Sequence, residues 1–197
     1  DILKKYGADI LRIWVASSNY SEDLRIDYSI LDQHSDSYRK IRNTFRYLLG
    51  NINDKFEKID PKKLDLKDLP ELEQYILHKI YVLDKNFKDY FKKYDFHNLY
   101  KDLLNFCTVD LSSFYFDIRK DTLYCDPISS EKRKNCIIVL NIILDHLLKW
   151  FAPILVFTCE EIYNLLNQSN KSIHLEKFND YSEFFKNTEL DKKWEEI

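Results

Sequence analysis

The chain has 197 residues, 45% of them hydrophobic, and a net charge of −3 from 30 basic and 33 acidic residues. This length predicts one domain whose core needs no disulfide or metal to fold, and the near balance of charge excludes a surface that is basic throughout. Only two glycines are present, which excludes a glycine-rich phosphate-binding loop and favours helices.

The cysteines and the apolar runs indicate where the protein works. No C-x-x-C pair and no histidine at metal-ligand spacing accompany the four cysteines, Cys107, Cys125, Cys136 and Cys159. Free thiols in a reducing compartment are therefore expected, and the predicted location is cytoplasmic. No apolar run approaches the ~20 residues that a membrane span needs, so no membrane partner is expected. The chain begins at Asp1 and contains no methionine, which predicts a segment of a longer protein.

The first third of the chain predicts two short helices and one long one. Residues 2–17 are helical in pattern, with a break at Gly7, and the polar residues 18–27 predict a loop. Ser29 should open a long helix, because Asp32 three residues later approximates a capping box. Its apolar stripe has steps of three and four and consists of Tyr38, Ile41, Phe45, Leu48 and Ile52. The charged residues 54–69 predict a surface connection.

Three further stretches have the same amphipathic period. Pro70 suits the first turn of a helix whose stripe is Leu72, Ile76, Ile80, Leu83 and Phe87. Asp95 can cap a helix that runs to about Lys120, and the residues from 121 to 130 predict a loop. Ser130 can cap the next helix, which Pro153 ends, and one more helix follows to about Leu166.

The polar tail carries weaker signals. Residues 172–175 predict a short strand, and residues 190–197 predict the start of another helix. The long amphipathic segments with short connections predict an all-α fold, an antiparallel helical bundle.

Patterns of catalysis or metal binding are missing from the sequence. The histidines form neither H-x-x-x-H nor H-E-x-x-H, no G-x-S-x-G motif occurs, and Cys107 has no adjacent partner. The adjacent acids Glu160 and Glu161 are typical of a solvated helix face. No catalytic, cofactor or metal residue is therefore predicted in this segment.

Basic residues are more informative. Arg39, Arg42 and Arg46 recur on the helix face away from the apolar stripe, where they could bind phosphates. Periodicity alone favours an ordinary solvated face. Arg119 and Lys120 form a second patch at a helix end, where the helix dipole is sufficient reason for cations. A third, weaker patch is Lys132, Arg133 and Lys134.

Four longer strings are specific enough to indicate a family. They are KKYGADILRIWVASSNYSEDLRI, SYRKIRNTFRYLLGNIND, YDFHNLYKDLLNFCTVDLSSFYFDIRKDTLYC and WFAPILVFTCEEIY. In order and spacing they resemble the bacterial-type isoleucyl-tRNA synthetases, which are class I enzymes. The resemblance covers residues 1 to about 166. It implies a stem-contact linker over residues 1–30, an anticodon-binding helical bundle over 31–166, and a tail over 167–197 that leads toward a C-terminal module.

The resemblance also implies a function. The bundle would bind the anticodon stem-loop of isoleucine tRNA, within an enzyme that attaches isoleucine to tRNA using ATP. The segment itself would be no enzyme and would hold no cofactor. ATP, Mg²⁺ and zinc would belong to other parts of the synthetase chain, which is the second expected partner. Two alternatives stay open: a related class I synthetase for valine or leucine, and a helical bundle that binds protein.

Particular residues gain weight from the resemblance. Lys120 matches a lysine that the family associates with reading the isoleucine anticodon, whereas Arg119 departs from the aliphatic residue that is common there. For Arg39, Arg42 and Arg46 the resemblance makes an RNA-facing role as plausible as the solvated face. RNA binding requires these arginines and Lys120 on one continuous exposed surface, and internal ion pairs would favour the protein-binding alternative.

Overall fold

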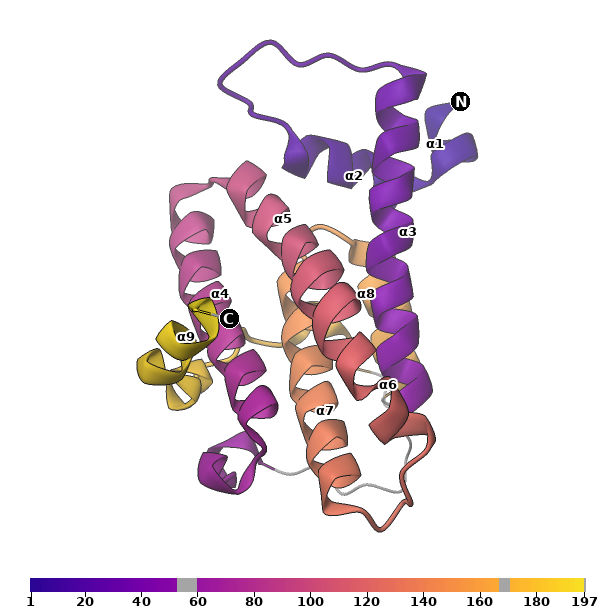
Figure 1. The fold of residues 1–197 in the computed structure, drawn as a ribbon. Helices are drawn as coiled ribbons and strands as arrows, with labels where there is room; N and C mark the ends of the chain where they lie inside the picture. Colours follow the sequence, from indigo (N-terminus) through magenta and orange to yellow (C-terminus); the bar gives the residue numbers. More distant parts are fainter. Residues whose placement is uncertain (53–59, 167–170, 197) are drawn as a thin grey trace.

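The computed structural model describes residues 1–52, 60–166 and 171–196 (Figure 1). All regular structure in these ranges is helical, which confirms the predicted all-α class. The α-helices are α1 (Ile2–Tyr6), α2 (Ala8–Ser17), α3 (Tyr28–Asn51), α4 (Glu71–Lys93), α5 (Phe96–Asn105), α6 (Phe116–Tyr124), α7 (Glu131–Phe151), α8 (Val156–Leu166) and α9 (Thr188–Glu195). A π-helix, η3 (Phe106–Tyr115), joins α5 to α6. The 3₁₀ turns are η1 (Pro61–Lys63), η2 (Leu66–Asp68), η4 (Ile173–Leu175) and η5 (Ser182–Phe185).

Long helices of alternating direction form the bundle. In Figure 1, α3 and the α5–α6 rod run down the page, whereas α4 and α7 run up it. The predicted stripe of α4 is buried along its whole length, and Ile41, Phe45 and Leu48 of α3 are also buried. Phe45 meets Phe151 of α7 edge to face, with ring centroids 6.0 Å apart. The core lies between α3, α4, the α5–α6 rod and α7.

Side-chain caps fix the starts of α3, α5, α7 and α9. Asp95 accepts a hydrogen bond from the backbone of Asn98, and Ser130 accepts one from that of Arg133, so both predicted caps are confirmed. Gly7 separates α1 from α2 with φ 84°, a left-handed conformation that glycine tolerates. The prediction that Ser29 caps α3 is wrong, because the carboxylate of Asp27 accepts from the backbone of Ile30 instead.

The rod from α5 to α6 is longer than predicted. It continues to Tyr124, so the predicted loop from 121 to 130 is shorter by one helical turn. Its middle is η3, where Ser112 donates to the carbonyl of Cys107 and Ser113 to that of Thr108. Each hydroxyl reaches back five residues, which matches the i→i+5 spacing of a π-helix.

The N-terminal segment is fastened to the bundle by two polar side chains of α2. Asp9 is buried and accepts hydrogen bonds from the backbone N–H of Phe157 and from the N–H and hydroxyl of Thr158, at 3.3, 2.8 and 2.6 Å. Arg12 donates to the carbonyls of Pro153 and Ile154 at 2.6 and 2.9 Å. The carboxylate thus satisfies the free N–H groups that begin α8, and the guanidinium satisfies carbonyls that follow α7.

The C-terminal segment lies across α4 and α7. Asp84, which is buried, accepts hydrogen bonds from Trp150 Nε1, from Lys88 Nζ and from the hydroxyl of Ser182 in η5. The predicted strand at residues 172–175 is instead the 3₁₀ turn η4. Ser172 caps that turn, and no neighbouring strand exists in the described ranges to pair with it.

The connection before α4 is only partly described by the structure. The predicted connection 54–69 lies partly in residues 53–59, outside the described residues, and the remainder carries η1 and η2. Within the part that the structure describes, no helix is both long and apolar enough to cross a membrane.

Asp9→Asn should lower the free energy of unfolding by about 1–2 kcal/mol, because a helix N-terminus loses its charged cap. Chemical denaturation of this chain measures the change. Asp23→Asn is the matched control, since Asp23 is exposed in the loop before α3. Equal stability of the two variants would show that the Asp9 contacts contribute nothing.

His146 makes the fold sensitive to acid. It is fully buried against Trp150, Tyr181 and Phe185, and its Nδ1 must donate to the carbonyl of Ile142, 2.8 Å away. Nε2 has no partner among the described residues. Burial lowers the pKa of His146, so the folded chain keeps the ring neutral where the unfolded chain would protonate it.

Stability should therefore fall as the pH falls below about 6.5, the ordinary histidine pKa. Between about pH 7.5 and pH 5.5 the native chain should lose about 1 kcal/mol more than His146→Phe, which has no titrating ring. Urea unfolding at the two pH values gives both losses. Identical losses would contradict the assignment to His146.

Candidate RNA-binding surface

The three predicted arginines share one exposed face of α3. Arg39 pairs with Asp36 one turn earlier, at 2.7 Å, and both side chains are mostly in solvent. Arg42 and Arg46 are exposed and form no ion pair with the described residues. Two guanidinium groups on this face are thus free to bind an anion, whereas the charge of Arg39 is partly offset.

Lys120 is exposed on α6, which packs along the C-terminal end of α3. The Tyr47 ring stacks on Phe116, with centroids 4.2 Å apart and planes 16° apart, and Asn51 donates to the hydroxyl of Tyr124. Lys120 lies four residues from both Phe116 and Tyr124, so it occupies the edge of α6 that faces α3. It forms no hydrogen bond or ion pair with the residues that the structure describes.

The arginine face and Lys120 lie on neighbouring helices but do not merge. Successive residues of an α-helix differ by about 100°, so Arg46 leaves α3 in a different direction from Tyr47. Since α6 lies on the Tyr47 side, Tyr47 and Asn51 separate Lys120 from the arginines. Helix phase thus divides these cations into two groups, one on α3 and one on α6.

Arg119 is buried, which corrects its prediction as an RNA-binding residue. Its Nε and Nη2 donate to the two carboxylate oxygens of Glu73 on α4, at 2.5 and 2.6 Å. Tyr115 donates to the same carboxylate at 3.2 Å. Burial opposes the charge of Arg119, but the hydrogen bonds and negative charge of Glu73 outweigh it and raise the pKa of Arg119 above its ordinary value. Two nitrogens of the guanidinium thus bind Glu73 inside the bundle and are not available to RNA.

Comparison with known proteins places this arrangement in a family. The family described as the anticodon-binding domain of tRNA ligase matches residues 73–197, more than half of the chain. The chain belongs to this family. Its match includes the buried Glu73–Arg119 pair and α6 with Lys120.

Curated relatives are similar over the whole chain. Identity is 74% to an isoleucine–tRNA ligase of Pelagibacter ubique, 43% to one of Agrobacterium fabrum and 44% to one of Petrotoga mobilis. The chain covers 22%, 20% and 21% of these proteins, so it spans about a fifth of the length of the relatives that it matches.

A solved structure shares the fold. It is the agnB2 LeuRS of Agrobacterium radiobacter K84, in a ternary complex with tRNA and LeuAMS. The TM-score is 0.69 at 12% identity, and the match covers 94% of this chain and 21% of that one. At this identity the likeness concerns the fold alone.

Glu73 is the residue of this anticodon-binding domain that the sequence reading missed. Its place in the first turn of α4 would suit an exposed acid at the positive end of the helix, but the side chain is fully buried. A signal was present, because Glu73 lies three residues before Ile76 and four before Leu77, both in the core. An acid at a core-facing position of an amphipathic helix indicates a buried cationic partner.

Other polar groups of the domain are engaged locally. In the third basic patch, Lys134 pairs with Glu131 and Arg133 donates to the carbonyl of Asp126. Among the described residues, no group of three or more His, Cys, Asp or Glu side chains could hold a metal ion.

Burial raises the pKa of the Cys136 thiol to about 11, so this thiol is neutral at physiological pH.

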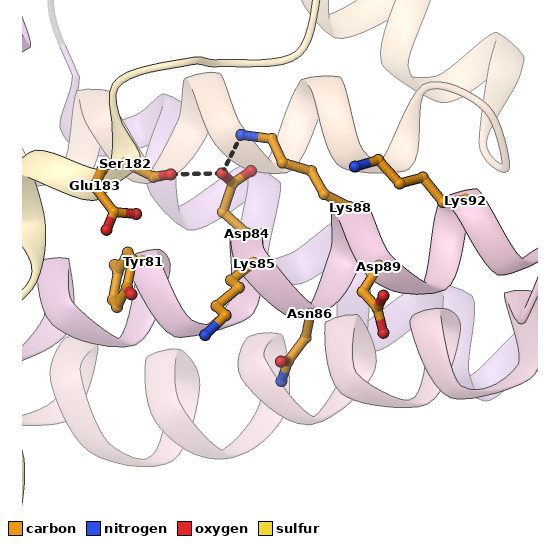
Figure 2. A pocket seen from close by; sticks show the side chains of 9 residues that line it. All are labelled: Tyr81, Asp84, Lys85, Asn86, Lys88, Asp89, Lys92, Ser182 and Glu183. Atoms are coloured by element: carbon orange, nitrogen blue, oxygen red, sulfur yellow. Dashed lines mark hydrogen bonds and ion pairs between the residues drawn. The ribbon is translucent and has the colours of Figure 1, made fainter.

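One surface groove follows α4 beside η5. Figure 2 shows Lys88 and Ser182 pointing at the carboxylate of Asp84, while Lys85 and Asp89 both point away from it, below the helix in this view. Side chains of both charges line the groove, and the carboxylate of Asp84 already accepts three hydrogen bonds. The contacts in this groove therefore hold the C-terminal segment on α4, and the groove is not a uniformly basic surface for RNA.

Glu73→Gln should lower the free energy of unfolding by about 3 kcal/mol, because it leaves the guanidinium of Arg119 buried without a counter-charge. The double variant Glu73→Leu with Arg119→Met removes both charges and should lose less. Denaturant titration of both variants checks the order. A double variant less stable than the single one would contradict this reading of the pair.

Proposed function

We propose that this chain binds the anticodon stem-loop of isoleucine tRNA as one part of an isoleucine–tRNA ligase. The observation that carries the proposal is 74% identity over all 197 residues to a relative of that name, within a family of anticodon-binding domains. The leucine-enzyme neighbour is only 12% identical and supports the fold alone. Isoleucine is therefore favoured over the leucine alternative.

The two groups of cations suit different parts of an RNA hairpin. Proteins bind an A-form stem mainly through its phosphates, which Arg42 and Arg46 could contact from the exposed face of α3. A single-stranded loop presents base edges, and Lys120 is a free donor beside aromatic side chains. Arg119 is not part of this proposal, because its guanidinium is paired inside the bundle.

The proposal extends to the whole ligase. The reaction would join isoleucine to tRNA, and this segment would position the tRNA without catalysing a step. ATP, Mg²⁺ and zinc would act in other parts of the ligase chain, in the cytoplasm. The protein-binding alternative is supported by the separation of Lys120 from the arginines, which makes an RNA-binding measurement the deciding experiment.

Binding of an isoleucine anticodon stem-loop should weaken as salt rises, because binding releases counterions from the phosphates. The variants Arg42→Gln and Arg46→Gln should each reduce the slope of log K against log salt by about 1. Lys101→Gln is the control, since Lys101 is exposed on α5. Fluorescence anisotropy across a salt series measures the slopes. Unchanged slopes in both arginine variants would remove the phosphate contacts from the proposal.

Lys120→Ala should weaken a cognate stem-loop more than one with a changed anticodon, because a base contact depends on sequence and a phosphate contact does not. Aminoacylation by the whole ligase with this substitution gives a second readout. Equal losses on the two loops would identify Lys120 as a phosphate contact. A wild-type ligase that does not distinguish the loops would contradict anticodon recognition itself.

A further inference from the structure

An exposed tyrosine stands beside Lys120. Tyr124 is the last residue of α6, and 61% of its surface is in solvent. It lies one helical turn after Lys120, so the two side chains share one edge of α6. The hydroxyl of Tyr124 accepts a hydrogen bond from the amide of Asn51 at 3.4 Å, which ties the ring to the end of α3.

Packed aromatic side chains lie beneath this edge of α6. Tyr47 stacks on the buried ring of Phe116 and donates its hydroxyl proton to the carbonyl of the same residue at 3.3 Å. On the adjoining inward face of α6, Arg119 and Leu123 are buried, and Arg119 is held by both oxygens of Glu73. The edge carrying Lys120 and Tyr124 is thus positioned before any ligand binds.

Asn51 and Lys120 have hydrogen-bonding groups beside Tyr124 that no described residue uses. Asn51 donates its amide hydrogens to the carbonyl of Tyr47, at 2.9 Å, and to the hydroxyl of Tyr124. Its oxygen accepts nothing from the described residues, and the Lys120 ammonium group has no partner among them. A donor and an acceptor beside an aromatic face complement the edge and the face of a nucleobase.

The local charge favours a base over a phosphate. Asp117 and Asp121 are exposed on α6 next to Lys120, and no ion pair joins either of them to it. A dianionic surrounding repels a phosphate, whereas a neutral base experiences no such net repulsion. The phosphate-binding capacity of the surface lies instead with Arg42 and Arg46 on α3.

We propose that Tyr124, Lys120 and Asn51 form a subsite for one unpaired nucleobase. The base stacks on the ring of Tyr124, and its edge hydrogen-bonds to the ammonium of Lys120 and the amide oxygen of Asn51. This subsite rests on the proposed function, because it assigns a stacking residue to the recognition of the anticodon loop.

Substitution in the whole ligase separates stacking from the hydroxyl contact. Tyr124→Ala should lower kcat/KM for isoleucine tRNA about tenfold through KM, whereas Tyr124→Phe keeps the ring and should stay within about twofold of the native enzyme. Activation of isoleucine by ATP without tRNA should not change. Tyr94→Ala is the matched control, because Tyr94 is 68% exposed and joins α4 to α5 at the other end of the bundle (Figure 1). Equal losses in Tyr124→Phe and Tyr124→Ala would overturn stacking.

A set of anticodon stem-loops with one abasic nucleotide each locates the stacked base. Tyr124→Ala should weaken every loop about tenfold except one, on which the native and variant ligases should bind alike because the stacked base is already missing. A loss that is equal for all loops would make Tyr124 a structural residue and overturn the subsite.

The same titrations distinguish the two levels of the proposal. If the native ligase prefers the isoleucine loop and Tyr124→Ala binds it equally well, the subsite is wrong and the proposed function stands. If the native ligase shows no preference among loops, anticodon recognition fails, and the subsite fails with it.

Discussion

The bidentate pair between Glu73 and Arg119 ties α6 to α4 inside the bundle, and the candidate surface depends on that connection. Neither charge is stable in the interior alone, so the two side chains stay paired and hold α6 against α4. With Arg119 turned inward, Phe116 meets Tyr47 of α3 and Lys120 faces solvent. The position of the candidate base contact is therefore set by an ion pair that touches no RNA.

Directional polar contacts of the same kind join both ends of the chain to the bundle. Asp9 and Arg12 fasten α2 to the connection between α7 and α8, and Asp84 fastens η5 to α4. Apolar packing alone would allow helices to slide, whereas these bonds fix their register. The division into residues 1–30, 31–166 and 167–197 stays a prediction, and buried contacts run across both boundaries.

Periodicity predicted the helices and the buried stripes well, because the apolar residues on the buried face of an amphipathic helix recur every three or four positions in its sequence. The stripe of α4 and the caps at Asp95 and Ser130 were readable for this reason. The site was less readable. Arg119 and Lys120 are adjacent cations, and which one is buried depends on Glu73, 46 residues away. Sequence spacing within one helix carries no information about such a partner, and family resemblance pointed to Lys120 without showing where Arg119 goes.

The π-helix between α5 and α6 has a consequence for changes in chain length. A regular α-helix that continued the buried side of α5 through Leu103, Phe106 and Asp110 would turn Asp117 and Asp121 toward the core. Wider turns over Phe106–Tyr115 shift the phase, so that Phe116, Arg119 and Leu123 are buried instead. Loss of one residue from this segment would rotate α6 by about 100° and bring acids to the interior. Evolution can therefore replace residues in η3 far more readily than it can delete one.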